Sequence, residues 1–192
     1  KTRLALKYFL ESTNYKNPIV TNLSTTLAVD KIAIQNKVEV IRSKVGEINV
    51  VEMMKKHQSS FGGEGNGGVI LPDVHLGRDA PVAAVLTLQH LAEADCSISE
   101  LKQSLPQFYI LKDKQSLGDV DPDKVIDFIS KESQDERLDH TDGLRIDRDD
   151  CWIHLRKSNT EPIMRIIVEA RTPEIAWRIP QEMKEKIAQL KN

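Results

Sequence analysis

Two short strings of this 192-residue chain combine the residue types that bind polar, anionic small molecules. In the first, Glu64 and Asn66 stand among the five glycines of residues 62–68. In the second, residues 156–162 read RKSNTEP and place a guanidinium, two hydroxyls and an amide within five positions. Carboxylate and amide groups can bind sugar hydroxyls, and a turn rich in such donors can bind a phosphate. The two strings therefore indicate a clamp for a phosphorylated sugar.

The glycine-rich string is the candidate sugar site. Glycines let the backbone approach a ligand closely and adopt positive φ. The Glu64 carboxylate can accept hydrogen bonds from two hydroxyls, and the Asn66 amide can both donate and accept, so the pair matches vicinal sugar hydroxyls. The alternative is a hairpin loop in which the glycines only satisfy turn geometry.

The RKSNTEP string is the candidate phosphate site. Arg156 can donate a planar pair of hydrogen bonds to phosphate, and Ser158, Asn159 and Thr160 add short donors alongside backbone N–H groups. Arg165 follows on the next strand-like run and is a further candidate. The alternative is an ordinary hydrogen-bonded hairpin, because Ser, Asn and Thr are common turn residues.

Two cationic side chains near the first string are additional candidates. Lys44 lies two residues before Gly46 and is a point charge suited to phosphate or to proton transfer. A lone lysine is more commonly a solvated surface group. Arg78 can serve the sugar site or form a salt bridge with Asp79 or its neighbours.

An aspartate-rich string at residues 119–123 imitates a metal-binding loop. An EF-hand loop needs glycine at its sixth position and glutamate at its twelfth, where this chain has Lys124 and Ser130. Asp121, which precedes a proline, is better interpreted as a helix N-cap. The five histidines are scattered, so we predict no metal ligands in this chain.

The composition narrows the class of protein. Acidic residues number 29 and Lys plus Arg 27, a balance that disfavours nucleic acid as a partner. No apolar run approaches the roughly 18 residues of a membrane span, and no signal peptide is recognised at the first residues. Cys96 and Cys151 have no metal-site spacing and are expected to be reduced. We therefore expect a cytoplasmic protein without a membrane or nucleic-acid partner.

The first domain is predicted to span residues 1–105 as an α/β/α unit with a mixed sheet. Helical and extended patterns alternate there, which favours crossover connections. The last long helix has almost no polar face and is expected to be buried on most sides, with Asp79 as its N-cap. Helices are predicted at 3–12, 26–35, 48–57, 80–94 and 97–105, and extended runs at 19–23, 38–42, around 61 and at 68–71.

The second domain is predicted to span residues 106–192 as a smaller α+β unit. Three consecutive strand-like runs, with Asp149-Asp150 as a hairpin signal, favour an antiparallel sheet with helices on one face. A C-terminal helix should begin after the N-cap Thr172, and Pro180 in its middle should kink or break it. Strands are predicted at 108–114, 143–147, 152–156 and 163–169, and a further helix at 122–133.

Both strings also resemble motifs of a known family, the α-D-phosphohexomutases, which include phosphoglucomutase, phosphomannomutase and phosphoglucosamine mutase. FGGEGNGGVIL at 61–71, followed by GRDA at 77–80, is similar to the sugar-recognition loop of that family. Asp142-Gly143-Leu144 with Trp152 and RKSNTEP is similar to its C-terminal phosphate-binding domain. Lys44-Val45-Gly46-Glu47 falls where the family has a Lys-x-Gly loop. The resemblance covers nearly the whole chain in the family's order.

The resemblance implies reversible transfer of phosphate between O1 and O6 of a hexose, with glucose, mannose and glucosamine left open. It implies that Glu64 and Asn66 contact sugar hydroxyls and that the RKSNTEP turn, through Arg156, Ser158, Asn159 and Thr160, clamps the phosphate. The chain departs from the family pattern at three positions. Asn66 replaces a more usual Ser, Gly68 a common His, and Glu47 a His found in many relatives.

The family's catalytic strings are missing from the sequence. The resemblance implies a phosphoserine and a Mg²⁺ site on upstream domains and a hexose 1,6-bisphosphate activator, but the chain has neither a Ser-His-Asn-Pro nor an Asp-Gly-Asp-Arg string. We therefore expect the third and fourth domains of a four-domain enzyme, without catalytic residues of their own except Lys44 as an auxiliary. The alternative is a free-standing sugar-phosphate binding or regulatory module.

Overall fold

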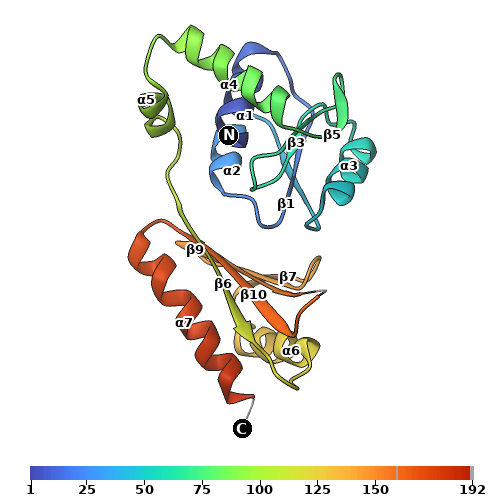
Figure 1. Cartoon of the computed structure of the whole chain (residues 1–192), viewed down its shortest axis with the longest axis vertical. Coiled ribbons are helices and arrows are strands. Elements are labelled where there is room, and N and C mark those ends of the chain that lie inside the picture. The colour runs from blue at the N-terminus through green and yellow to red at the C-terminus, as the bar shows by residue number, and fades with distance from the viewer. Residues whose placement is uncertain (159, 191–192) are drawn as a thin grey trace. The chain divides into compact units, whose positions relative to one another are not determined.

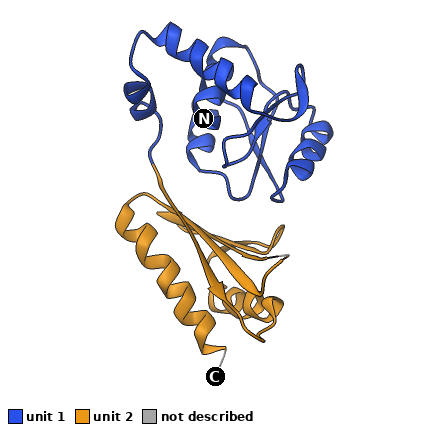
Figure 2. Ribbon diagram, viewed as in Figure 1, with its two compact units in different colours: residues 1–107 blue, residues 108–192 orange. Residues whose placement is uncertain are grey.

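The chain forms two compact units, Lys1–Gln107 and Phe108–Asn192 (Figures 1 and 2). The structure is a computed structural model and describes residues 1–158 and 160–190. Each unit has its own sheet and its own apolar core. No helix among the described residues has the length and apolar character needed to cross a bilayer.

The first unit contains a five-stranded mixed sheet, sheet A, in the order β2-β1-β3-β4-β5. β1 pairs in parallel with both β2 and β3, whereas β4 pairs antiparallel with β3 and β5. The predicted mixed sheet is therefore confirmed. The strands are β1 Ile19–Asn22, β2 Val40–Ser43, β3 Gly62–Gly63, β4 Val69–Leu71 and β5 His75–Asp79.

Helices cover both faces of sheet A. Successive side chains of a strand point to opposite faces of the sheet, so neighbouring residues of one strand pack in different cores. Ile19 of β1 packs in the larger core with α1, α2, α4 and α5, whereas the next residue, Val20, packs with Val50 and Met54 of α3. This two-sided burial is the predicted α/β/α arrangement. The helices are α1 Thr2–Ser12, α2 Ala28–Gln35, α3 Glu47–Lys56, α4 Ala80–Ala94 and α5 Ile98–Gln103.

Helix α4 differs from its prediction. Its N-cap is Asp79, as expected, and the Asp79 side chain accepts a hydrogen bond from the Val82 amide at 2.9 Å. However, only Ala83 and His90 of the helix are buried. Val85 and Leu88 are 63% and 64% exposed, so burial on most sides was wrong. The apolar sequence reflects one packed face, against α1 and β4, plus an apolar face that no described residue covers.

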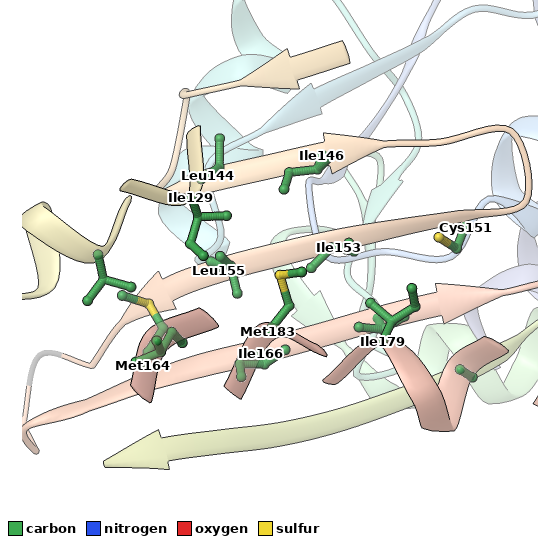
Figure 3. Packing of buried hydrophobic residues seen from close by; sticks show 14 of the residues in the cluster. Ile129, Leu144, Ile146, Cys151, Ile153, Leu155, Met164, Ile166, Ile179 and Met183 are labelled. Atoms are coloured by element: carbon green, nitrogen blue, oxygen red, sulfur yellow. The ribbon is translucent and has the colours of Figure 1, made fainter. Parts of the chain in front are cut away.

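The second unit is an antiparallel sheet, sheet B, in the order β6-β10-β9-β8-β7, and this α+β prediction is also confirmed. Alternate residues of the strands form one apolar face that packs on α6 and α7 (Figure 3). The elements are β6 Tyr109–Ser116, α6 Pro122–Glu132, β7 Arg137–Asp139, β8 Leu144–Asp147, β9 Cys151–Lys157, β10 Ile163–Ala170 and α7 Pro173–Gln189.

Helix α7 runs unbroken through Pro180, so the expected break does not occur. A proline inside a helix removes one hydrogen bond and costs about 3 kcal/mol or more. Pro180 is itself buried, in the same stripe as Ile179, Met183 and Ile187, which pack on sheet B. Burial of this stripe offsets the lost hydrogen bond. The N-cap Thr172, which accepts from the Ile175 amide, is as predicted.

Candidate functional site

Glu64 is the centre of a hydrogen-bonded cluster in the first unit. It is buried, with 4% of its surface exposed. Its Oε1 accepts from Asn22 Nδ2 at 2.7 Å and from the Gly46 amide at 3.2 Å, and its Oε2 lies 3.3 Å from Arg78 Nη1. Two carboxylate oxygens offer about four lone-pair positions. The three contacts leave one lone-pair position on Oε2 without a partner among the described residues.

The cluster brings four separate segments of chain together. Asn22 ends β1, Gly46 precedes α3, Glu64 follows β3 and Arg78 belongs to β5. Asn22 was not singled out from the sequence. Its position at the carboxyl end of a parallel strand was the available signal, because ligand-facing groups of α/β sheets gather at that edge. Glu64 therefore has a structural role that the glycine-rich string alone does not reveal.

Arg78 forms ion pairs with Glu47 and Glu64 rather than with Asp79. Arg78 Nε lies 2.6 Å from Glu47 Oε2, and its backbone amide donates to Glu47 Oε1 at 3.2 Å. Hydrogen bonds from the Arg78 side chain and backbone lower the pKa of Glu47 from its ordinary value. Glu47, which stands where many relatives carry histidine, is thus an ionised partner of Arg78.

Asn66 lies at the exposed tip of the β3–β4 turn. The turn is closed by hydrogen bonds from the Glu64 amide to the Gly68 carbonyl and from the Gly67 amide to the Glu64 carbonyl. Asn66 Oδ1 accepts from the Gly68 amide at 3.1 Å, and Gly67 has φ +96°, which favours glycine. The Asn66 Nδ2 has no partner among the described residues, so it is available to donate to a ligand.

Lys44 lies on the loop between β2 and α3, two residues before the Gly46 amide that contacts Glu64. Its side chain is exposed and pairs with no acidic residue in the described part of the chain. The structure therefore places Lys44 on the same loop as the Glu64 cluster but assigns it no contact with that cluster.

Arg156 ends in a guanidinium that is only partly engaged. Its Nε lies 2.9 Å from Asp142 Oδ2, an ion-pair distance, although the N–H is not aligned for a hydrogen bond. The side chains of both residues are largely shielded, with 23% and 18% exposed. Nη1 and Nη2 of Arg156 have no partner among the described residues. Two such nitrogens of a planar guanidinium can donate a pair of parallel hydrogen bonds to an anion.

The turn after Arg156 carries two hydroxyls close together. Ser158 Oγ and Thr160 Oγ1 are 3.5 Å apart, and the Thr160 amide donates to Ser158 Oγ at 3.4 Å. Ser158 also donates its backbone amide to the Ile163 carbonyl, which closes the β9–β10 turn. The predicted contact residue Asn159 lies outside the described residues. Arg165 is directly opposite Arg156 in the β9–β10 register, so both cations lie on one face of sheet B.

The backbone beside Arg156 is fixed by a close approach of two strands. Gly143 has φ +74°, and an added Cβ would lie 2.2 Å from the Leu155 carbonyl oxygen, so only glycine fits. His154 Nε2 lies 2.6 Å from the Asp142 carbonyl oxygen, which can only accept, so Nε2 carries the proton. These contacts hold Asp142 where it pairs with Arg156.

His154 makes the stability of the chain depend on pH. Burial lowers its pKa to about 4, so the folded state keeps the imidazole neutral where the unfolded chain becomes protonated. Between pH 6.5 and 4 the unfolded state binds more protons, and stability should fall by roughly 3 kcal/mol from this residue. We expect His154→Gln, which keeps a donor toward Asp142, to reduce the loss of stability between pH 7 and pH 5. Urea unfolding at both pH values measures this loss, and an identical loss in parent and variant would contradict the assignment.

Neither metal ligation nor thiol chemistry is indicated by the described residues. They contain no group of three or more His, Cys, Asp or Glu side chains placed to hold a metal ion. Asp121 caps α6 by accepting from the Asp123 amide at 2.9 Å, as the sequence predicted. Cys96 and Cys151 are free, and burial raises the pKa of Cys151 to about 11, which suppresses its thiolate.

Two protein-family models match consecutive parts of the chain. The model of phosphoglucomutase/phosphomannomutase, alpha/beta/alpha domain III, matches residues 2–109, and the C-terminal domain of the same enzymes matches residues 111–186. The chain belongs to the phosphoglucomutase/phosphomannomutase family. The first match contains the Glu64 cluster and the second contains the RKSNTEP turn, so the family predicted from these strings is confirmed.

Relatives of the family differ in their sugar. A probable phosphoglucosamine mutase of Pyrococcus horikoshii is 38% identical over 168 residues, which are 85% of this chain and 37% of that protein. A structure of a phosphoglucomutase/phosphomannomutase family protein from Burkholderia thailandensis has a TM-score of 0.79 at 21% identity, over 99% of this chain and 42% of that one. The chain thus spans about two-fifths of the length of these proteins.

The crystal structure of a third relative contains bound ligands. N-acetylphosphoglucosamine mutase from Aspergillus fumigatus, in complex with GlcNAc-6P and magnesium, has a TM-score of 0.65 at 11% identity, over 97% of this chain and 46% of that one. The same enzyme has also been solved with glucose 1,6-bisphosphate. At such identities the likeness shows a shared phosphohexomutase fold.

Proposed function

We propose that this chain is the sugar- and phosphate-recognising part of a phosphohexomutase that interconverts hexose 1-phosphates and 6-phosphates. The observation that carries the proposal is the pair of family matches, to domain III and to the C-terminal domain, in that order along the chain. The chain is about two-fifths of the length of such enzymes, so the remaining domains must supply the rest of the active site.

In the proposed enzyme, the Arg156 fork and the hydroxyls of Ser158 and Thr160 hold the substrate phosphate that is not being transferred. Arg156 Nη1 and Nη2 are free to donate, which supports this role. Asn159 stays a proposed contact from the sequence. Arg165, opposite Arg156 on the neighbouring strand, adds positive charge beside the turn. Phosphoryl transfer depends on positioning and on electrostatic stabilisation, and holding one phosphate fixes the sugar for reaction at its other end.

The Glu64 cluster is the proposed sugar site. Oε2 of Glu64 has one lone-pair position open, and Asn66 Nδ2 has no partner in the described part of the chain. An acceptor and a donor on one turn suit two neighbouring hydroxyls. Arg78 serves chiefly to hold Glu64 and Glu47 in place, and Lys44 is proposed as a mobile cation for the sugar phosphate or for proton transfer.

The proposed enzyme also requires Mg²⁺ and a hexose 1,6-bisphosphate activator. The fungal relative was solved with magnesium and, separately, with glucose 1,6-bisphosphate. The described residues of this chain provide no group of ligands for the metal. We therefore assign Mg²⁺ and the phosphoserine to upstream domains of the same enzyme. Its reaction in carbohydrate metabolism is proposed to take place in the cytoplasm.

Titration of the chain with a hexose phosphate tests the two recognition sites. Glucose 1-phosphate, mannose 1-phosphate and glucosamine 6-phosphate should shift the backbone amide resonances of Asn66, Gly67, Ser158 and Thr160 in the ¹⁵N-labelled chain. Unphosphorylated glucose should leave the Ser158 and Thr160 resonances unchanged, since it offers no anion. The proposal is wrong if none of the three sugar phosphates moves resonances of either turn.

A further inference from the structure

A hollow of about 470 Å³ lies on sheet B of the second unit. This volume lies within the range of ordinary small-molecule sites. Its lining comes from the edge strand β6, from β10 and from the turn that precedes β10. The lining residues are three cations, two isoleucines and two acidic residues: Lys112, Lys114, Arg165, Ile163, Ile167, Asp113 and Glu161.

The three cations of the hollow have no side-chain partner in the described part of the chain. Lys112, Lys114 and Arg165 are exposed, and none of their side chains forms an ion pair or hydrogen bond with any described residue. By contrast, two other cations of the second unit form ion pairs, Arg148 with Glu136 and Lys184 with Asp113. The three cations that line the hollow share one face of sheet B.

The strand register places like charges directly opposite one another. Arg165 of β10 pairs with Lys114 of β6 on one side and with Arg156 of β9 on the other. Like charges at directly opposed positions of a sheet destabilise it. Of the three residues in register, Lys114, Arg165 and Arg156, only Arg156 has a carboxylate partner among the described residues. An anion bound between Lys114 and Arg165 would relieve the repulsion.

The other lining residues affect how strongly the three cations attract an anion. Ile163 and Ile167 are half-buried and form an apolar floor between the cations. Charges act more strongly beside an apolar surface than in open water. Two carboxylates also line the hollow, Glu161 and Asp113, and Asp113 forms an ion pair with Lys184. Three cations and two carboxylates leave the lining with a formal net charge of about +1.

Lysines on an edge strand have a simpler interpretation. Exposed lysines discourage the edge from pairing with another chain. This reason applies to Lys112 and Lys114 of β6, which is at the edge of sheet B. It does not apply to Arg165, because β10 lies between β6 and β9. The unpaired guanidinium in the interior of the sheet favours a ligand over edge protection.

We propose that Lys112, Lys114 and Arg165 form a second anion-binding site, which takes a phosphate group and adjoins the phosphate site of the RKSNTEP turn. The phosphate can be free inorganic phosphate or part of a larger phosphorylated molecule. The proposal is based on the side chains that β6 and β10 place around the hollow, and it does not depend on the proposed sugar-phosphate function.

Amide resonances of the ¹⁵N-labelled chain distinguish the two sites. Inorganic phosphate should shift the resonances of Lys112, Lys114 and Arg165, and sodium chloride at equal ionic strength should not. The double variant Lys112→Gln/Lys114→Gln keeps exposed polar side chains of similar length and should weaken this response about tenfold. Glu161→Gln removes the opposing charge and should strengthen it. Glucose 1-phosphate in a parallel titration shows whether the site also accepts a phosphorylated sugar.

The double glutamine variant also provides the decisive comparison between the two sites. It should leave the response of Ser158 and Thr160 to glucose 1-phosphate unchanged, because both lysines belong to β6 and not to the turn. The proposal is overturned if the phosphate response at residues 112, 114 and 165 persists undiminished in that variant, if sodium chloride reproduces it, or if the variant also abolishes the response of Ser158 and Thr160. Responses of Ser158 and Thr160 to glucose 1-phosphate report on the proposed function independently, so the failure of one site is distinguishable from failure of the other.

Discussion

Replacing Arg156 with alanine should weaken the binding of hexose phosphates by about 10- to 150-fold, because a charge-assisted hydrogen-bonding contact contributes about 1.5–3 kcal/mol. The guanidinium presents Nη1 and Nη2 free of described partners, beside the hydroxyls of Ser158 and Thr160. The binding constant of the chain for glucose 1-phosphate, measured by calorimetry or by amide shifts, gives the change. The same variant removes the ion pair between Arg156 and Asp142, so a modest loss of stability accompanies the loss of affinity.

Two further variants separate the phosphate role of Arg156 from its structural role. Arg156→Lys keeps a cation for Asp142 but lacks the planar guanidinium. Compared with Arg156→Ala, it should therefore regain more of the lost stability than of the lost affinity for the sugar phosphate. Arg178→Ala removes an exposed arginine of α7 that pairs with Glu182, and it should change neither quantity appreciably. A melting temperature that falls sharply in Arg156→Ala while affinity is retained would assign the residue to the fold alone.

The sequence predicts most of the fold because the helices carry local signals. The N-cap Asp79, the N-cap Thr172 and the hairpin signal at Asp149-Asp150 all occur as predicted. Strands β5 and β7 were not predicted. Both are short edge strands without alternation, and pairing with β4 and β8 rather than their own sequence defines them. The exposure of α4 was also missed, because apolar composition does not indicate how many partners surround a helix.

The candidate sugar and phosphate sites could be predicted only in part, because the sequence shows their residues but not the contacts that position them. Glu64, Asn66 and the RKSNTEP turn are contiguous strings whose residue types suggest their chemistry. The contacts that position them are distant in sequence: Asn22 is 42 residues from Glu64. The pairing of Arg78 with Glu47, rather than with Asp79, depends on the packing of β5 beside α3. Such contacts follow from the tertiary fold, and a single sequence does not specify them locally.

The central claim is that this chain supplies sugar and phosphate recognition to a phosphohexomutase whose reacting groups lie on other domains. The most direct test is a mutase assay with Mg²⁺ and a hexose 1,6-bisphosphate, applied to the 192-residue chain alone and to the protein that joins it to the upstream domains. Glucose 1-phosphate, mannose 1-phosphate and glucosamine 1-phosphate should each be offered as substrate.

The chain alone should give no turnover, because its sequence has neither the serine string nor the aspartate-rich string that the family uses for phosphoryl transfer and for the metal. The joined protein should convert at least one of the three 1-phosphates to its 6-phosphate, and Arg156→Ala should reduce its kcat/KM. Turnover by the chain alone, above a mock-purified control, would contradict the division of roles. A joined protein that binds the sugar phosphates but converts none would instead identify the chain as part of a binding or regulatory protein.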